Sequence, residues 1–212
     1  MMSDCLSPPE IEGRLISVVP LSMQHYDDLV DAISDDELSH PWQLNTHAPH
    51  PIRAEITRRL TLGQTGSMLP FTVIEKQTNR AVGMTSYLNF DIVGRKTEIE
   101  TLCAHPSVRD SLYNTECQSL LLQHAFETLQ YAEVEFRVHF KDTQSRRGIE
   151  RLGARLDGVL RSNTFPANGS VRDTAVYSIT FFDWLTIKAD LASHLKETPT
   201  LEMASTRTTK FG

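Results

Sequence analysis

An alternation of apolar and polar positions over residues 133–140, EVEFRVHF, is the clearest pattern in the chain. Val134, Phe136, Val138 and Phe140 are separated by charged residues and one histidine. This period of two predicts a strand with one buried face. Similar runs, bounded by turn residues or charges, predict six further strands. They cover residues 13–21, 70–76, 81–90, 96–104, 154–161 and 173–182.

Other segments show the helical period instead. Leu122, Phe126 and Leu129 recur at helical spacing, beside Leu121 and Ala125, and predict a helix that starts near residue 114. Four more helices are predicted in the same way. They cover residues 22–33, capped by Ser22 with Tyr26, Leu29, Val30 and Ile33 as the apolar stripe, 52–63 with Ile52, Ile56 and Leu60, 144–153 ending at Gly153, and 183–195.

The order of these elements indicates an α+β fold. One strand and two helices precede three consecutive strands, and a helix, a strand, a helix and two strands follow before the last helix. This order predicts a mixed, mostly antiparallel sheet of about seven strands with helices on both faces. A chain of 212 residues suits one such domain. We expect it to cover residues 13–196, with flexible ends at 1–12 and 197–212.

Composition and charge narrow the range of functions. The net charge of −6 argues against nucleic acid as a partner, because no basic block is present to neutralise phosphates. Cys5, Cys103 and Cys117 lack metal-finger spacing, so we expect a reducing compartment and no metal. The sequence has no signal-peptide pattern and no apolar run of membrane-spanning length. We therefore expect a cytoplasmic protein without a membrane partner.

The start of the helix near residue 114 is a candidate anion site. Arg109 precedes it, and polar Asn114 and Thr115 stand at its beginning. Backbone N–H groups at a helix start lack partners within the helix and can hold a phosphate. However, no glycine lies between His105 and Phe126. The residues alone therefore leave open an anion site without glycines and a capped helix without a ligand.

Two carboxylates lie on the strand at 96–104. Glu98 and Glu100 are two residues apart and therefore share one face of that strand. Two neighbouring acids can raise each other's pKa, which suits a general base that works near neutral pH. The alternative is that both are solvated on an exposed face. His139, on the polar face of the strand at 133–140, is a further candidate for the base.

Several motifs occur here in the order in which a known family carries them. Between Gly13 and about Leu195 the chain resembles the GNAT acyltransferase superfamily, in particular the branch of the ribosomal-protein N-terminal acetyltransferases. The matching segments are GRLISVVPL, VGMTSYLNFD, TEIE followed by HP, NTECQSLLLQHAFETL, SRRGIERLGARLDGVLR and RDTAVYSITFFDW. The resemblance implies the GNAT fold and acetyl-CoA as the cosubstrate.

The resemblance also implies a cofactor site. Residues 109–115 correspond to the GNAT loop whose N–H groups hold the pyrophosphate, with Arg109 at its first position. Leu112 and Asn114 stand where the family has small residues. Leu112 fits there if its φ is negative, and Asn114 tolerates unusual φ values. The implied cofactor contacts of this segment are Arg109, Leu112, Tyr113, Asn114 and Thr115. Cys103, near the end of its strand, lies near the expected thioester or is a small core residue.

Further along, the implied site includes Asp142 and Ser145. Asp142 stands where the family commonly has an asparagine that contacts the pantetheine arm. Ser145 follows in the first turn of the next helix, where it either caps that helix or protonates the departing thiolate. Many GNAT enzymes place a tyrosine acid in this helix, and Ile149 stands there instead.

The resemblance leads to a functional expectation. The protein is expected to move an acetyl group from acetyl-CoA to a primary amine, by direct attack of the amine, with Glu98, Glu100 and Ser145 as candidate catalytic residues. The acceptor is either a peptide N-terminus or a small molecule, and a homodimer is possible. The alternatives are a GNAT-fold protein that binds acyl-CoA without turnover and an interaction module that has lost the cofactor.

Overall fold

The computed structural model describes residues 8–32, 51–103, 112–164 and 172–197. Within them, eight strands form one sheet in the order β1-β2-β3-β4-β5-β6-β8-β7. Neighbouring strands are antiparallel except β5 and β6, which are parallel. The strands are β1 Ile11–Glu12, β2 Ile16–Pro20, β3 Met68–Glu75, β4 Arg80–Asp91, β5 Lys96–Cys103, β6 Glu133–His139, β7 Arg155–Thr164 and β8 Arg172–Thr180.

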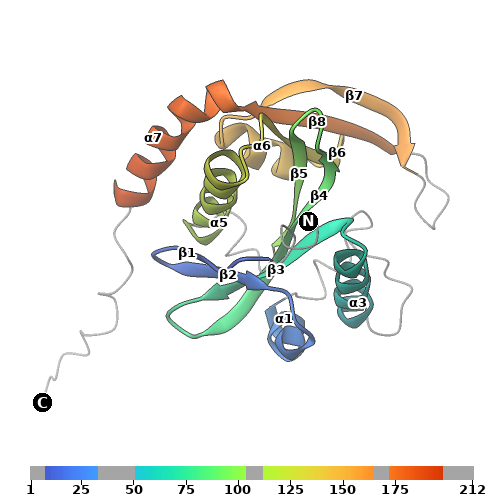
Figure 1. Ribbon diagram of the computed structural model, residues 1–212, viewed down its shortest axis with the longest axis vertical. Helices are drawn as coiled ribbons and strands as arrows, with labels where there is room; N and C mark the ends of the chain where they lie inside the picture. The colour runs from blue at the N-terminus through green and yellow to red at the C-terminus, as the bar shows by residue number, and fades with distance from the viewer. Residues whose placement is uncertain (1–7, 33–50, 104–111, 165–171, 198–212) are drawn as a thin grey trace, which may run out of the picture.

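Helices lie on both faces of this sheet (Figure 1). A 3₁₀ turn precedes the first helix, and a π-helical turn, His124–Thr128, continues the third. No helix in the described part of the chain is long and apolar enough to cross a membrane. The helices are α1 Tyr26–Ala32, α3 Pro51–Gln64, α5 Leu112–Gln123, α6 Thr143–Arg151 and α7 Phe181–Glu197.

Two hydrophobic cores hold these layers together. The larger core packs α5 and α7 against one face of the sheet, and Trp184 of α7 stacks on Phe126 with ring centroids 5.6 Å apart. The smaller core packs α1 and α3 on the opposite face, over the β4 residues Ala81 and Met84. The α+β class, the mixed and mostly antiparallel sheet and the helices on both faces are therefore confirmed.

The sheet also contains a strand that the sequence did not predict. The short strand β1 pairs with β2 and adds Ile11 and Glu12 to the domain. The buried Glu116 of α5 holds the start of β2, because its carboxylate accepts hydrogen bonds from the N–H groups of Arg14, Leu15 and Ile16 at 2.8, 2.8 and 3.0 Å. A carboxylate with three backbone donors anchors the N-terminal segment on α5.

Some positions of the predicted apolar faces prove to be exposed. Leu129 is 36% exposed and Val30 is 42% exposed. Leu129 was expected to continue the buried stripe, but it follows the π-helical turn, whose wider spacing breaks the helical period. Phe181 and Phe182 were assigned to the last strand and instead open α7. Phe182 is 81% exposed, so its hydrophobicity does not report burial.

The parallel pair β5 and β6 is joined along only part of its length. Lys96, Thr97 and Glu98 pair with Glu133, Val134 and Glu135. Beyond this register β5 continues to pair with β4, and β6 continues to pair with β8. The two strands therefore part after Glu98, which opens the middle of the sheet at the point where the predicted carboxylates lie.

Candidate active site

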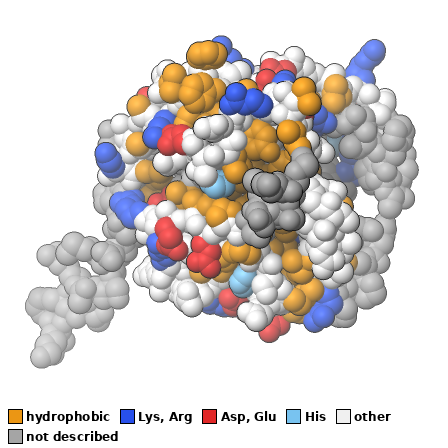
Figure 2. Space-filling model, in the orientation of Figure 1, with side chains coloured by type: hydrophobic (Ala, Val, Ile, Leu, Met, Phe, Trp, Pro, Cys, Tyr) orange, Lys and Arg blue, Asp and Glu red, His pale blue; other side chains and the backbone are white. Residues whose placement is uncertain are grey.

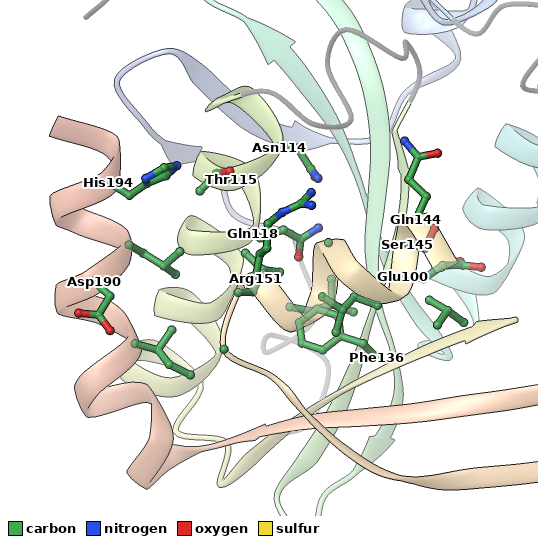
Figure 3. Close-up of a pocket in the computed structure, with 18 of the residues that line it drawn as sticks. Glu100, Asn114, Thr115, Gln118, Phe136, Gln144, Ser145, Arg151, Asp190 and His194 are labelled. Atoms are coloured by element: carbon green, nitrogen blue, oxygen red, sulfur yellow. The ribbon is translucent and has the colours of Figure 1, made fainter. Parts of the chain in front are cut away.

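A cavity of about 830 Å³ lies where β5 and β6 part, and α5, α6 and α7 complete its wall. Figure 3 shows that its ends differ in chemistry. Next to the strands the labelled residues are Glu100, Phe136, Gln144 and Ser145. Toward α5 and α7 they are Asn114, Thr115, Gln118, Arg151, Asp190 and His194, so this end carries a carboxylate as well as two basic side chains.

Glu98 is buried beside the point where the strands part. An irregularity in β4 places Asn89 in the left-handed region at φ 52°, and its amide donates to Glu98 Oε2 at 2.7 Å. Arg137 Nε lies 3.4 Å from the same oxygen. Burial raises the pKa of Glu98 from 4.5 to about 7, and the negative charge of Glu100 adds a smaller increase. The pKa therefore rises as expected, but desolvation is the main cause rather than the paired acids.

Glu100 lines the cavity and is held from the α3 side of the sheet. Arg59 Nη2 lies 3.0 Å from Glu100 Oε2, and Arg58 Nη2 lies 3.7 Å from it. Arg59 is buried and also donates to Glu55 Oε1 and to Ser86 Oγ, each at 2.7 Å. The alternative that both acids are solvated is therefore wrong: Glu98 is buried, whereas Glu100, with 40% of its side chain exposed, is paired with a buried guanidinium.

Asp142 and Ser145 form the N-terminal cap of α6. Asp142 Oδ1 accepts from the Ser145 backbone N–H at 3.0 Å, and the Ser145 hydroxyl donates to Asp142 Oδ2 at 2.7 Å. The cap is therefore Asp142 and not Ser145. Ser145 lines the cavity, and its hydroxyl proton is directed to the carboxylate. To protonate a thiolate, Ser145 would first have to release this hydrogen bond.

The structure also places the residues of the expected phosphate loop. α5 begins at Leu112, so the backbone of Leu112 is helical and does not require a glycine. Asn114 and Thr115 line the cavity. The Tyr113 phenol instead hydrogen-bonds to Glu75, which raises the pKa of Tyr113. Arg109 lies outside the described residues, and of Cys103 the structure describes only its place at the end of β5.

Two cationic or polar side chains of the cavity were not found from the sequence. Arg151 comes from the last turn of α6, and His194 comes from α7. Arg151 stands in the helix that begins near Ser145, seven residues after Gln144, which also lines the cavity, and a spacing of seven places both on one helix face. His194 lies more than 40 residues further along the chain, so only the tertiary structure brings it to this cavity.

His139, the remaining candidate for the base, lies outside the wall of the cavity. Its Nδ1 accepts from the backbone N–H of Lys141 at 3.0 Å. Burial lowers the pKa of His139, and the nearby cations of Arg172 and Lys141 lower it further. Of the three candidates, Glu98 therefore has a pKa raised toward neutrality, and Glu100 has direct access to the cavity.

The donors in the cavity wall suit an anion more than a metal ion. Among the described residues, no group of three or more His, Cys, Asp or Glu side chains has a metal-binding arrangement. Arg151, His194 and the first turn of α5 offer the donors that phosphates accept. Lysine and arginine side chains are scattered over the face shown in Figure 2 and do not form one basic patch there.

Comparison with known proteins agrees with this geometry. The family model of the acetyltransferase (GNAT) domain matches residues 16–155. The structure is similar to a GCN5-related N-acetyltransferase from Brucella melitensis, with 27% identity and a TM-score of 0.78, covering 89% of this chain and 86% of that one. It is also similar in fold to Mycobacterium smegmatis RimJ in complex with CoA-disulfide, with 20% identity and a TM-score of 0.73, covering 89% and 95%.

A search of curated proteins returned no match. The family model spans well over half of the chain, and it includes β5, β6, α5 and α6, which build most of the cavity. The match ends before β8 and α7, so the α7 wall of the cavity with His194 lies outside it. The chain belongs to the GNAT family of acetyltransferases.

Proposed function

We propose that the protein transfers an acetyl group from acetyl-CoA to a primary amine in the cavity between β5 and β6. The observation that carries this proposal is the pairing of two chemistries in one cavity. A carboxylate with a pKa near 7 lies beside the end where the strands part, and a guanidinium, an imidazole and the first turn of α5 lie toward the other end. This arrangement fits a cosubstrate whose reactive thioester is remote from its phosphates.

The end formed by α5, α6 and α7 is assigned to the phosphates. The first turn of α5 directs backbone N–H groups and the positive end of the helix dipole outward, which favours an anion. Arg151 adds a guanidinium, and His194 adds a ring donor from the opposite wall. Arg109 is assigned to the same end from the sequence. Bound there, acetyl-CoA supplies an activated acyl group with a thiolate as its leaving group.

The carboxylates are assigned to the amine. The cationic acceptor must lose one proton before it can attack, and Glu98, with a pKa of about 7, is ionised in enough molecules to accept that proton near neutral pH. The nitrogen loses a second proton as its bond to the acyl carbon replaces the C–S bond, and this proton balances the one that the departing thiolate takes up. Glu98 is buried below the cavity wall, so a bridging water relays the proton. Glu100, fixed by Arg59, attracts the cationic acceptor. Ser145 is the candidate that returns a proton to the departing thiolate.

The acceptor is a primary amine, for which this site offers the carboxylates of Glu98 and Glu100. A peptide N-terminus and a small-molecule amine both satisfy this chemistry. One of the similar structures is RimJ, and another is described as a ribosomal-protein-serine acetyltransferase from Vibrio cholerae. The second name specifies a ribosomal protein, which favours a protein acceptor as the first to test.

The phosphate assignment is tested by the affinity for CoA. Arg151→Ala should weaken CoA binding, measured by calorimetry, about 10-fold or more, because a charge-assisted contact is worth about 1.5–3 kcal/mol. Arg147→Ala is the matched control: it removes the same charge from an exposed position of α6 outside the cavity wall. Equal affinities of both variants and the wild type would contradict the assignment.

The transfer itself is tested by thiol release from acetyl-CoA with a panel of amines that includes serine- and alanine-starting peptides. Thiol release that depends on the added amine would support an acetyltransferase. Tight CoA binding without amine-dependent release would instead support an acyl-CoA-binding protein without turnover. If CoA does not raise the melting temperature, the protein does not bind it, and acetyl-CoA is excluded as the cosubstrate.

A further inference from the structure

Gly148 occupies the interior of α6, where glycine is unfavourable. The helix spans Thr143–Arg151, so Gly148 lies neither at its start nor at its end. A glycine inside a helix destabilises it relative to alanine, because the unfolded chain loses more conformational freedom on folding. The presence of glycine at this position of α6 therefore needs an explanation from its surroundings.

Packing within the protein does not supply that reason. A Cβ atom built on Gly148 would meet only Arg151 Nη2, at 3.9 Å, which is an ordinary contact. At Gly153, in contrast, a Cβ atom would lie 2.7 Å from Ile187, and its φ of 93° requires glycine. No neighbour among the described residues excludes a side chain at position 148, and its backbone is helical.

The space beside Gly148 is the cavity. Gly148 lies on the face of α6 that lines it, one turn after Gln144 and one turn before Arg151 and Leu152. Figure 3 places Ser145 at the end of the cavity with Glu100, and Arg151 at the end with Asn114 and Gln118. Gly148 therefore lies between the proposed thioester end and the proposed phosphate end.

We propose that Gly148 keeps a channel open for the pantetheine arm of the acyl-CoA. This inference rests on the proposed function, because that function requires a slender linear segment to connect the two ends of the cavity. The missing side chain lets the arm lie against the helix backbone. A side chain at position 148 projects into this channel, and it obstructs the arm more as it grows.

The inference predicts opposite effects on stability and on binding. G148A should raise the melting temperature of the free protein by about 1–4 °C, because alanine is the better helix former. G148L, with a side chain that enters the channel, should raise the Kd for CoA about 5- to 150-fold, the range expected for overpacking. A merely structural glycine would not combine a gain in stability with a loss of binding.

Gly158 of β7 provides the matched control. A Cβ atom built on Gly158 meets nothing within 4 Å, and Gly158 lies outside the cavity wall. G158L should therefore keep the Kd for CoA within about two-fold of the wild type, as expected for a surface substitution. Melting temperatures are measured by calorimetry without ligand, and Kd values by titration with CoA.

The outcomes separate this inference from the proposed function. If the wild type and G148L bind CoA equally well, the proposed role of Gly148 is wrong, but the proposed function is not affected. A lower melting temperature for G148A would also overturn it, because the structure then needs the glycine for its own packing. Wild type that does not bind CoA would overturn both.

Discussion

Glu98 offers the sharpest test of the site, because its burial affects stability as well as catalysis. The side chain is 6% exposed, and burial raises its pKa to about 7. Glu98→Gln keeps the size of the side chain and an oxygen that can accept from Asn89. The substitution therefore removes the charge and its desolvation cost while preserving the nearby packing.

The magnitude follows from the difference between the two pKa values. Each tenfold change in ionisation is worth about 1.36 kcal/mol, so a rise from 4.5 to about 7 corresponds to about 3 kcal/mol. Below pH 4.5 Glu98 is protonated in both states and the penalty is absent. Between pH 4.5 and 7 the unfolded chain releases the proton first, so stability falls. Above pH 7 the full penalty remains.

Urea unfolding at pH 4 and at pH 8 measures this effect. Glu98→Gln should unfold with nearly the wild-type free energy at pH 4, and it should be more stable than the wild type by up to about 3 kcal/mol at pH 8. The same variant should lose about 10²- to 10⁴-fold in the rate of acetyl transfer if Glu98 is the general base. Glu10→Gln, at an exposed position, should show equal differences at both pH values.

Two results would refute this reasoning. A variant no more stable than the wild type at pH 8 would mean that Glu98 carries no desolvation penalty. If Glu98→Gln is more stable at pH 8 but transfers acetyl groups at the wild-type rate, Glu98 carries the desolvation penalty but is not the general base. Glu100 would then be the residue to test, and His139 after it.

Two further predictions concern the scaffold. Glu116→Ala should destabilise the protein by about 3 kcal/mol in urea, because three backbone donors lose their acceptor, and Glu116→Gln should cost less. Arg59→Met should destabilise it by about 3–5 kcal/mol, since Glu55 and Glu100 lose a buried partner. Adding Glu55→Gln to Arg59→Met should restore part of that loss, and no recovery would contradict the ion-pair explanation.

The local pattern was sufficient to predict the α-helices and strands of the described residues and their order, except for the short strand β1. The alternation at 133–140 gave β6, in which Val134 and Phe136 are fully or nearly buried, but Phe140 lies beyond the end of the strand and is 38% exposed. Gly153 ended α6 in the left-handed region at φ 93°, as its position predicted. Periods of two and 3.6 report which face is buried, because each element buries one face against a common core. The same logic failed at Leu129, where a π-helical turn breaks the period.

The site required the tertiary structure. The sequence placed Glu98 and Glu100 on one face, but only the folded chain shows that burial raises the pKa of Glu98 and that Arg59 fixes Glu100. His194 joins the cavity from α7, and Asn89 reaches Glu98 through an irregularity in β4. Desolvation and long-range pairing depend on which segments pack together. A single sequence does not carry that information in its local periodicity.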